Sequence, residues 1–536
     1  MLLKTSDTHF LKISSYWLVI LTIWLGNQSV FGQSMTNPVE QVSFQTPKTL
    51  YFSGEKIWFD AKVTIGTEPS ASQVVYAELV DRNAVSIIHA KVPLQKGEAV
   101  NYLKIPEQTP SDHYLLRVYT RISPYLDINA GISQQFVTVI NPRIPPKSSN
   151  NSQKAVIQAS QQVAKGATVE FPASVGGVAV ANASGISIAN PFLPEEQHQW
   201  KSDEVYTDLV KENLLPELFG HVVKVKVPTP DTTLTYFLSV HGVQSALFTD
   251  HPDRNGNLVF DIGGLRHWDR LIVQLENGQE MPGLEVISPV IKTTFRKEFD
   301  FPELTIQESQ LEELSRLLKA SMMQTYFLER FENDSLEVVT GFVADYTYHL
   351  DDYTRFENVE TVLREYVPSV AVRTREKKKE FRLLNEANKT VFEANPLIVV
   401  DAMPVFDSDL LASFNPKLLQ RLEVLNREFY LNDRTYPGVL SFSSYTNNFG
   451  LFPLAPSARF FDYHGLQPFI ELDKKQFSSS AANDRFPDWR TVLFWGENEN
   501  KISVQAPDLA GIFVFWEREI QNGVPSVKRT YFQVKN

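Results

Sequence analysis

The sequence contains no cysteine among its 536 residues. This absence excludes disulfide bonds, thiolate nucleophiles, zinc sites built on cysteine and internal thioesters. Without covalent cross-links, the folded chain must be stabilised by apolar side chains buried in several hydrophobic cores. The length predicts roughly three to five domains, because a single core rarely serves more than about 250–300 residues.

Basic residues are in the minority, with 51 Lys and Arg against 63 Asp and Glu and a formal net charge of -12. Phosphate groups would repel such a chain, and no basic stripe with interleaved aromatic residues is present. We therefore expect no nucleic-acid partner. The one basic cluster, residues 375–379, contains Glu376 and is followed by Glu380, which is typical of a solvent-exposed hairpin tip.

The sequence also lacks a long apolar run. The longest, YWLVILTIWL at residues 16–25, is shorter than the roughly twenty residues that span a bilayer. Lys4 and Lys12 precede it and small residues at 29–32 follow it, which is the pattern of a secretory signal peptide over residues 1–32. A retained anchor is the alternative. In either case we expect an exported chain, periplasmic or associated with the outer membrane, and without a membrane span after signal cleavage.

Known catalytic motifs are missing as well. There is no G-x-S-x-G elbow, phosphate-binding loop or dinucleotide fingerprint, and none of the ten histidines stands in a metal-ligand pattern. We predict no catalytic, cofactor-binding or metal-binding residue and hence no enzyme. Paired carboxylates such as Asp351–Asp352 and the aromatic residues near Trp489, Trp495 and Trp516 leave a carbohydrate-active protein as a weaker alternative.

Aromatic residues are abundant, with 36 Phe and 19 Tyr, and many stand in short segments of alternating polarity. This pattern favours a mainly β, multidomain chain of β-sandwiches with one small α+β domain. The predicted division after the signal peptide is a sandwich at 39–141, a linker at 142–155, a β unit with a long connection at 156–212, a sandwich at 213–300, an amphipathic helix at 304–331, an α+β domain at 340–450 and a C-terminal sandwich at 451–536.

Residues 51–63 (YFSGEKIWFDAKV), 74–83 (VVYAELVDRN) and 104–121 (KIPEQTPSDHYLLRVYTR) together resemble a macroglobulin-like domain of bacterial alpha-2-macroglobulin relatives. The LPELFG segment at 215–220 resembles the immunoglobulin-like module of the same envelope proteins. The resemblance implies immunoglobulin-like and macroglobulin-like sandwiches, a fold that carries no chemistry by itself.

The segments PLIVVDAMPV (396–405), NPKLLQRLEVL (415–425) and YPGVLSF (436–442) resemble, in order and spacing, the plug domain of TonB-dependent outer-membrane receptors. Ala402 stands where that family usually has Gly, and the last strand is not Thr-rich. Fewer than a hundred residues follow, which is too few for the receptor's transmembrane barrel.

These patterns predict a non-catalytic envelope protein that presents the plug-like domain to an outer-membrane barrel or another envelope protein. The alternative is a macroglobulin-like protein that binds peptides or proteases. The loop carrying Arg427, Asn432, Asp433 and Arg434 is the candidate partner contact, and a simply solvated loop is its other interpretation.

Overall fold

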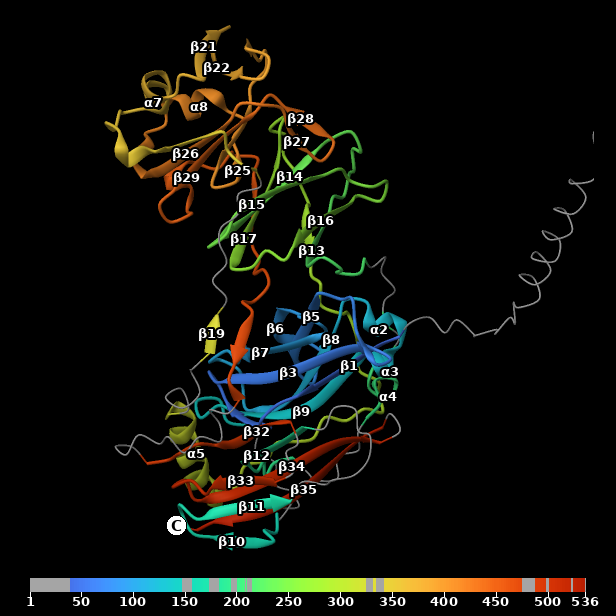
Figure 1. The fold of residues 1–536 in the computed structure, drawn as a ribbon. Helices are drawn as coiled ribbons and strands as arrows, with labels where there is room; N and C mark the ends of the chain where they lie inside the picture. Colours follow the sequence, from blue (N-terminus) through green and yellow to red (C-terminus); the bar gives the residue numbers. More distant parts are fainter. Residues whose placement is uncertain are drawn as a thin grey trace, which may run out of the picture. The chain divides into compact units, whose positions relative to one another are not determined.

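A computed structural model describes residues 39–146, 157–172, 183–193, 200–207, 209, 215–323, 331–333, 342–474, 487–497, 501–521 and 524–535 (Figure 1). The predicted fold class is confirmed: the chain is mainly β, with several sheets and separate hydrophobic cores. The predicted signal peptide, most of the 142–155 linker and residues 324–330 of the predicted helix lie outside the described residues.

The first sandwich contains the strands between residues 40 and 140. In one sheet β3 pairs with β1, β4 and β7, and the other has the order β2-β9-β8-β5-β6. Along β3, Ile57, Phe59, Ala61 and Val63 alternate with more exposed residues and are fully buried between the sheets. The bounds are β1 Glu40–Gln45, β2 Leu50–Phe52, β3 Lys56–Ile65, β4 Glu68–Pro69, β5 Val74–Val80, β6 Ser86–Pro93, β7 Glu98–Lys104, β8 Asp112–Tyr119, α2 Ser123–Leu126, α3 Ile128–Gly131 and β9 Ile132–Ile140.

The second sandwich packs the sheet β16-β13-β18 against the sheet β15-β14-β17-β30. Strand β30 (Arg459–Asp462) comes from the segment that the sequence assigned to the C-terminal sandwich. It forms backbone hydrogen bonds with the edge of β17 that β14 leaves unpaired. The predicted boundary at residue 451 is therefore wrong at this strand. The bounds are α4 Ser202–Val205, β13 His221–Lys226, β14 Tyr236–Gly242, β15 Ala246–Asp250, β16 Asn257–Gly263, β17 Trp268–Leu275 and β18 Glu285–Ile287.

An α+β unit follows, with the sheet β20-β26-β29-β24-β25. One face of this sheet carries α7, α8 and the hairpin β21–β22 through a shared core. The bounds are β20 Tyr346–His349, η2 Leu350–Asp352, α7 Val359–Tyr366, β21 Val370–Arg375, β22 Lys378–Asn385, β23 Thr390–Val391, β24 Leu397–Val400, β25 Met403–Pro404, α8 Ser408–Ser413, η3 Pro416–Leu418, β26 Leu419–Leu425, β27 Phe429–Leu431, β28 Arg434–Tyr436, β29 Val439–Ser444 and η4 Phe449–Leu451.

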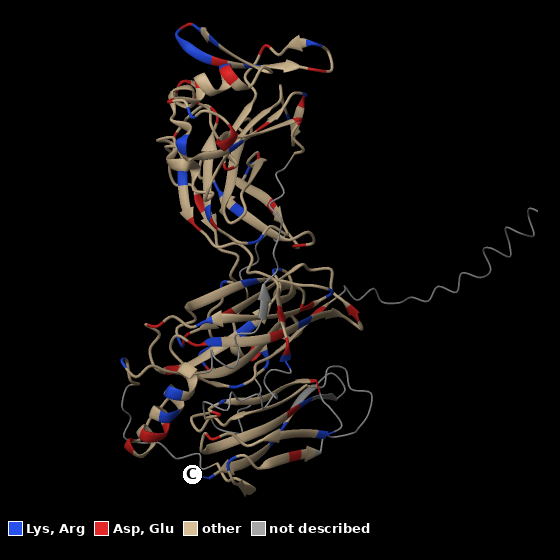
Figure 2. Ribbon diagram, turned by 60° about the vertical axis from the view of Figure 1, so that its left-hand side comes forward, with Lys and Arg blue, Asp and Glu red and all other residues tan. Residues whose placement is uncertain are grey.

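Two hairpin turns in this unit explain local sequence choices. Glu376 and Lys377 join β21 to β22 with positive φ angles, and the basic cluster around them is exposed, as the sequence predicts (Figure 2). Asp401 and Ala402 join β24 to β25 with φ angles of 47° and 67°. Two successive left-handed residues form the turn type that normally favours Gly.

The C-terminal sheet has the order β10-β35-β34-β12-β32, and β11 pairs with β33. The segment predicted as a separate β unit at 156–212 thus shares a sheet with the segment predicted as the C-terminal sandwich. The physical reason is that every residue of β12 is buried, so this strand needs a neighbour on each edge. The bounds are β10 Gln161–Val163, β11 Thr168–Pro172, β12 Ala183–Ile188, β32 Val492–Glu497, β33 Lys501–Gln505, β34 Gly511–Gln521 and β35 Val524–Val534.

The remaining elements are η1 Glu308–Gln310, α5 Leu311–Met323, β19 Phe331–Asn333 and β31 Ile470–Leu472. Helix α5 is amphipathic and docks Leu314, Leu317 and Ala320 on the core of the C-terminal sheet. It is shorter than the predicted helix at 304–331, because residues 304–307 are not helical and Phe331 begins β19. Within the described residues, no helix is both long enough and apolar enough to cross a membrane.

Candidate functional site

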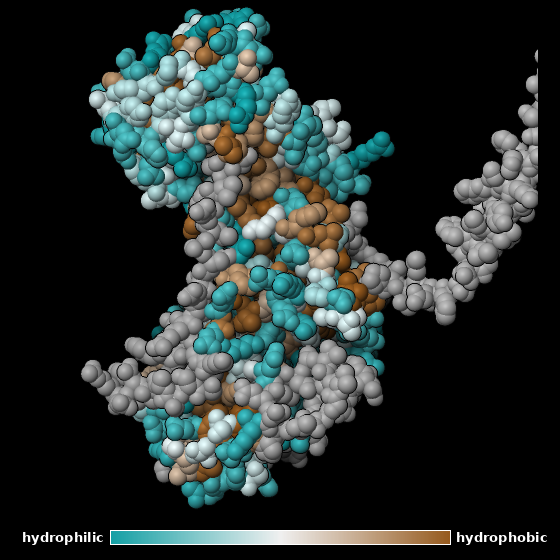
Figure 3. All heavy atoms as spheres, viewed as in Figure 1, coloured by the Kyte–Doolittle hydropathy of each residue, from teal (hydrophilic) through white to brown (hydrophobic). Residues whose placement is uncertain are grey.

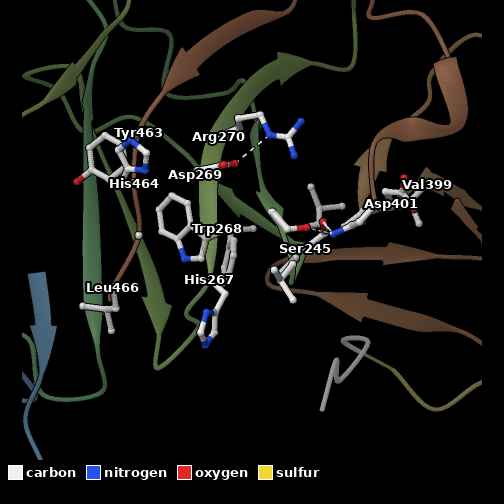
Figure 4. Close-up of a pocket in the computed structure, with 18 of the residues that line it drawn as sticks. Ser245, His267, Trp268, Asp269, Arg270, Val399, Asp401, Tyr463, His464 and Leu466 are labelled. Atoms are coloured by element: carbon white, nitrogen blue, oxygen red, sulfur yellow. Dashed lines mark hydrogen bonds and ion pairs between the residues drawn. The ribbon is translucent and has the colours of Figure 1, made fainter. Parts of the chain in front are cut away.

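A cavity of about 1560 Å³ lies where the first sandwich, the second sandwich and the α+β unit meet. Figure 4 shows Trp268, Asp269 and Arg270 on β17, between the segment carrying Tyr463 and His464 and the strands carrying Val399 and Asp401. Figure 3 shows hydrophobic residues gathering over strands β13 to β17. Of these strands, β14, β15 and β17 line the cavity, with Gly242, Ala246–Phe248 and Trp268–Arg270. The cavity is therefore built by strands that are distant in sequence.

One wall is the second face of the α+β sheet. Along β24, Ile398 and Val400 point into the core with the helices, whereas Leu397 and Val399 point to the opposite face. Both faces of this strand are thus apolar, as expected for a sheet covered on both sides. The cover over the second face is Leu247 of β15 together with the β27–β28 hairpin, and the cavity opens beside them.

A buried polar cluster lies between the two sandwiches. The Glu217 carboxylate accepts hydrogen bonds from the Tyr76 hydroxyl (2.8 Å), Arg121 Nη1 (3.1 Å), His221 Nδ1 (2.9 Å) and the Val222 amide (2.9 Å). Burial opposes ionisation of Glu217, yet these donors hold its pKa below the ordinary value. Burial also lowers the pKa of His221 to about 4, so the ring is neutral at pH 7.

Lys91 lies on β6 at the edge of this cluster and lines the cavity. Its Nζ stands 3.8 Å from the centre of the Tyr463 ring, which in turn stacks on Trp268. The residue is only 4% exposed. Burial and, less strongly, the Arg121 cation lower the pKa of Lys91 to about 7, although the Glu217 charge opposes the shift.

The serine and histidine beside the cavity do not form a nucleophile–base pair. Ser245 Oγ lies 3.4 Å from His241 Nδ1, while His241 Nε2 lies 2.8 Å from Ser239 Oγ. Burial lowers the pKa of His241 to about 3, so it cannot take a proton from serine near neutral pH. The Asp401 carboxylate is engaged in structural hydrogen bonds. It accepts from the backbone amide and hydroxyl of Ser444 and from the Phe449 amide.

Metal ligation has no support in the geometry either. Among the residues that the structure describes, no group of three or more His, Asp or Glu side chains is placed to hold a metal ion. His89, His267 and His464 all line the cavity without forming such a group.

The residues predicted as a partner contact hold the β27–β28 hairpin to the rest of the chain. Asn432 Nδ2 donates to the Thr249 carbonyl (2.6 Å), and Asp433 lies 2.8 Å from His251 Nε2. Arg434 donates to Thr235 Oγ1 (3.0 Å) and pairs with Glu276, and Arg427 Nη1 donates to Asp345 (2.5 Å). Asn432, Asp433 and Arg434 thus bridge the hairpin to the second sandwich, whereas Arg427 pairs within the α+β unit. Contact of this loop with a partner stays a prediction.

Sequence reasoning missed the cavity and Lys91. In β6, His89 and Lys91 alternate with Ala90 and Val92, a pattern that predicts a solvated face for the lysine. Ala90 and Val92 do enter the first core. Lys91 is buried because residues 463–467, far along the chain, cover it, and the backbone amide of Gln467 donates to the Lys91 carbonyl (2.8 Å).

No protein-family model and no curated protein sequence matches this chain. Comparison with solved structures finds Escherichia coli alpha-2-macroglobulin in its native conformation (8% identity, TM-score 0.21), covering 93% of this chain and 40% of that one. Salmonella alpha-2-macroglobulin reacted with methylamine (9% identity, TM-score 0.17) covers 92% of this chain and 23% of that one.

A CARDB domain from Pyrococcus furiosus, solved with di-metal ions (16% identity, TM-score 0.15), covers 19% of this chain and 94% of that one. The chain spans less than half the length of both macroglobulins. At these TM-scores the likenesses do not establish a shared activity.

Proposed function

We propose that this chain is a non-catalytic, exported protein that binds an extended segment of another polypeptide in the cavity. The observation that carries the proposal is that the outer strands of two different sheets border one large, largely apolar space. Strand β6 ends the sheet of the first sandwich, and β15 ends a sheet of the second. Unpaired strand edges are the usual docking sites for extended peptides, because they supply main-chain hydrogen bonds.

The size of the cavity favours a peptide over a small molecule. Pockets for small ligands usually measure about 300–1,000 Å³, and this cavity measures about 1560 Å³. The edge strands β6 and β15 each already accept a hydrogen bond from a segment that is not a strand. Gln467 donates to Lys91, and Asn432 donates to Thr249. The cavity is lined beside these contacts by His89 and Leu247.

The carbohydrate alternative has less support. A sugar-binding site needs aromatic rings that are free to stack on the ligand. Trp495 is 1% exposed in a core, and Trp268 is 3% exposed and stacked on Tyr463. Presentation of the plug-like unit to an outer-membrane partner stays a prediction, because no contact within the described chain bears on it.

The test is to pan a displayed library of random twelve-residue peptides against the full chain and to measure the affinity of enriched peptides by fluorescence anisotropy. Val243 lines the cavity with 69% of its surface exposed, so Val243→Glu places a charge at the mouth without disturbing a core. We expect a loss of about ten-fold in affinity, and a similar loss for Ser443→Arg, which fills the cavity.

The matched control is Val85→Glu. Val85 is 54% exposed in a turn and does not line the cavity. This variant should bind as the unchanged chain does. If no peptide is enriched, or if all three variants bind equally well, the peptide-binding proposal is wrong.

A further inference from the structure

We propose that Lys91 is a reactive amine that forms covalent adducts with small aldehydes entering the cavity. This inference does not rest on peptide binding. It starts from two buried lysines that differ in one respect. Lys48 is paired with Glu55 at 2.9 Å, and its side chain is 3% exposed. Lys91 is equally buried, but no described carboxylate lies within ion-pair distance of it.

The nearest candidate counter-ion is already committed. Glu217 affects Lys91 electrostatically. Its carboxylate already accepts hydrogen bonds from Tyr76, Arg121, His221 and the Val222 amide. One of these donors, Arg121, forms the ion pair at 3.1 Å. Oε1 accepts all four of these hydrogen bonds, Oε2 accepts a second one from the Tyr76 hydroxyl (2.8 Å), and neither oxygen forms an ion pair with Lys91.

The other groups facing Lys91 stabilise a cation only weakly or oppose it. Tyr463 offers its ring face at 3.8 Å, and burial raises the pKa of its hydroxyl, so the phenol stays neutral. His221 and His89 are both neutral at pH 7, since burial lowers their pKa values. The Arg121 cation adds repulsion. Lysines desolvated in this way are the ones that proteins use as nucleophiles.

The chemistry is imine formation. The lone pair of the neutral Nζ attacks the carbonyl carbon of the aldehyde, and a nitrogen proton moves to the oxygen to give a carbinolamine. Loss of water then gives the imine, with no change of oxidation state. Because Lys91 lines a cavity of about 1560 Å³, an aldehyde can approach it from that side.

The experiment treats the full chain briefly with low concentrations of isotopically labelled formaldehyde and cyanoborohydride, which reduces imines to stable amines. Peptide mass spectrometry then gives the labelling rate of each lysine. At pH 7 we expect Lys91 to be labelled about ten-fold faster than Lys96 and Lys104, whose side chains are exposed rather than buried. Lys48, buried and paired, should be labelled more slowly than either.

The pH profile separates reactivity from mere accessibility. The rate at Lys91 should level off above about pH 7, where its amine is mostly neutral. Lys91→Arg should abolish the fast phase and leave the other sites unchanged, and Val85→Glu, at an exposed residue that does not line the cavity, should keep it. Labelling of Lys91 no faster than that of Lys96, or a rate that still rises above pH 9, would overturn the proposal whatever the outcome of peptide panning.

Discussion

At the scale of single residues, two buried ion pairs of this chain join residues that lie far apart in sequence. Glu78 holds Arg117 at 2.6 Å within the first sandwich, and Glu217 of the second sandwich holds Arg121 of the first at 3.1 Å. Leaving one partner of a buried pair alone costs several kcal/mol, so such pairs fix the register between modules. Lys91 departs from this pattern beside the cavity.

Backbone strain at Ala402 gives a residue-scale prediction. Its φ of 67° places Cβ close to the carbonyl oxygen, which costs an L-residue about 1–2 kcal/mol relative to Gly. We expect Ala402→Gly to raise the free energy of unfolding by about 1 kcal/mol, as measured by urea titration. Ala71→Gly, at an exposed site without a positive φ, should lower it by about 0.5 kcal/mol. A destabilised Ala402→Gly protein would contradict this account.

At the scale of elements, alternation and turn residues were enough to predict local structure but not strand partners. The apolar run Leu397–Val400 and the turn after it are readable in the sequence, and the structure has them as β24 and its hairpin. The pairing of β12 with β34 is not readable, since nothing in ASGISI indicates which distant strand completes it. Non-local pairing depends on packing that only the whole chain supplies.

Gly185 tests that pairing. It lies opposite Trp516 in the β12–β34 register, and a Cβ at residue 185 would lie 2.5 Å from the indole ring. Gly185→Ala should therefore lower the free energy of unfolding by about 1–3 kcal/mol through overpacking. Gly264→Ala, where a Cβ meets open space, should leave it within about 0.5 kcal/mol. Equal effects in urea titrations would show that the two strands do not meet as described.

At the scale of the whole molecule, buried neutral histidines are distributed over several modules. Burial lowers the pKa of His113 and of His221 to about 4 and that of His241 to about 3. The unfolded chain takes up their protons near pH 6.5, well before the folded chain does. Since the unfolded state binds more protons in this window, the free energy of unfolding must fall as the pH drops from about 6.5 to 4.

We expect each of these histidines to contribute about 3 kcal/mol to that loss. In His113→Phe the urea midpoint should change less between pH 6.5 and 4.5 than in the unchanged chain, whatever its stability at pH 7. His349→Phe, at an exposed histidine, should keep the full pH dependence. Identical pH profiles for the two variants would refute the assignment.

The cavity was not predictable at this scale because its walls belong to segments near residues 90, 245, 270, 400 and 465. The local sequence of each segment predicts only an ordinary strand or turn. The loop at residues 427–434 is polar in the sequence, but the sequence does not indicate that Asn432 and Arg434 contact the second sandwich, about 200 residues earlier.

The shared C-terminal sheet has a consequence for how the protein is made. Roughly 330 residues separate Gly185 from Trp516. Because synthesis adds about 5–20 residues per second, β12 is made tens of seconds before its partner strand β34. During that time its buried side chains have no cover, and the contact order of the sheet is high. Folding of this chain during synthesis therefore depends on protection of an early buried segment until the last strands arrive.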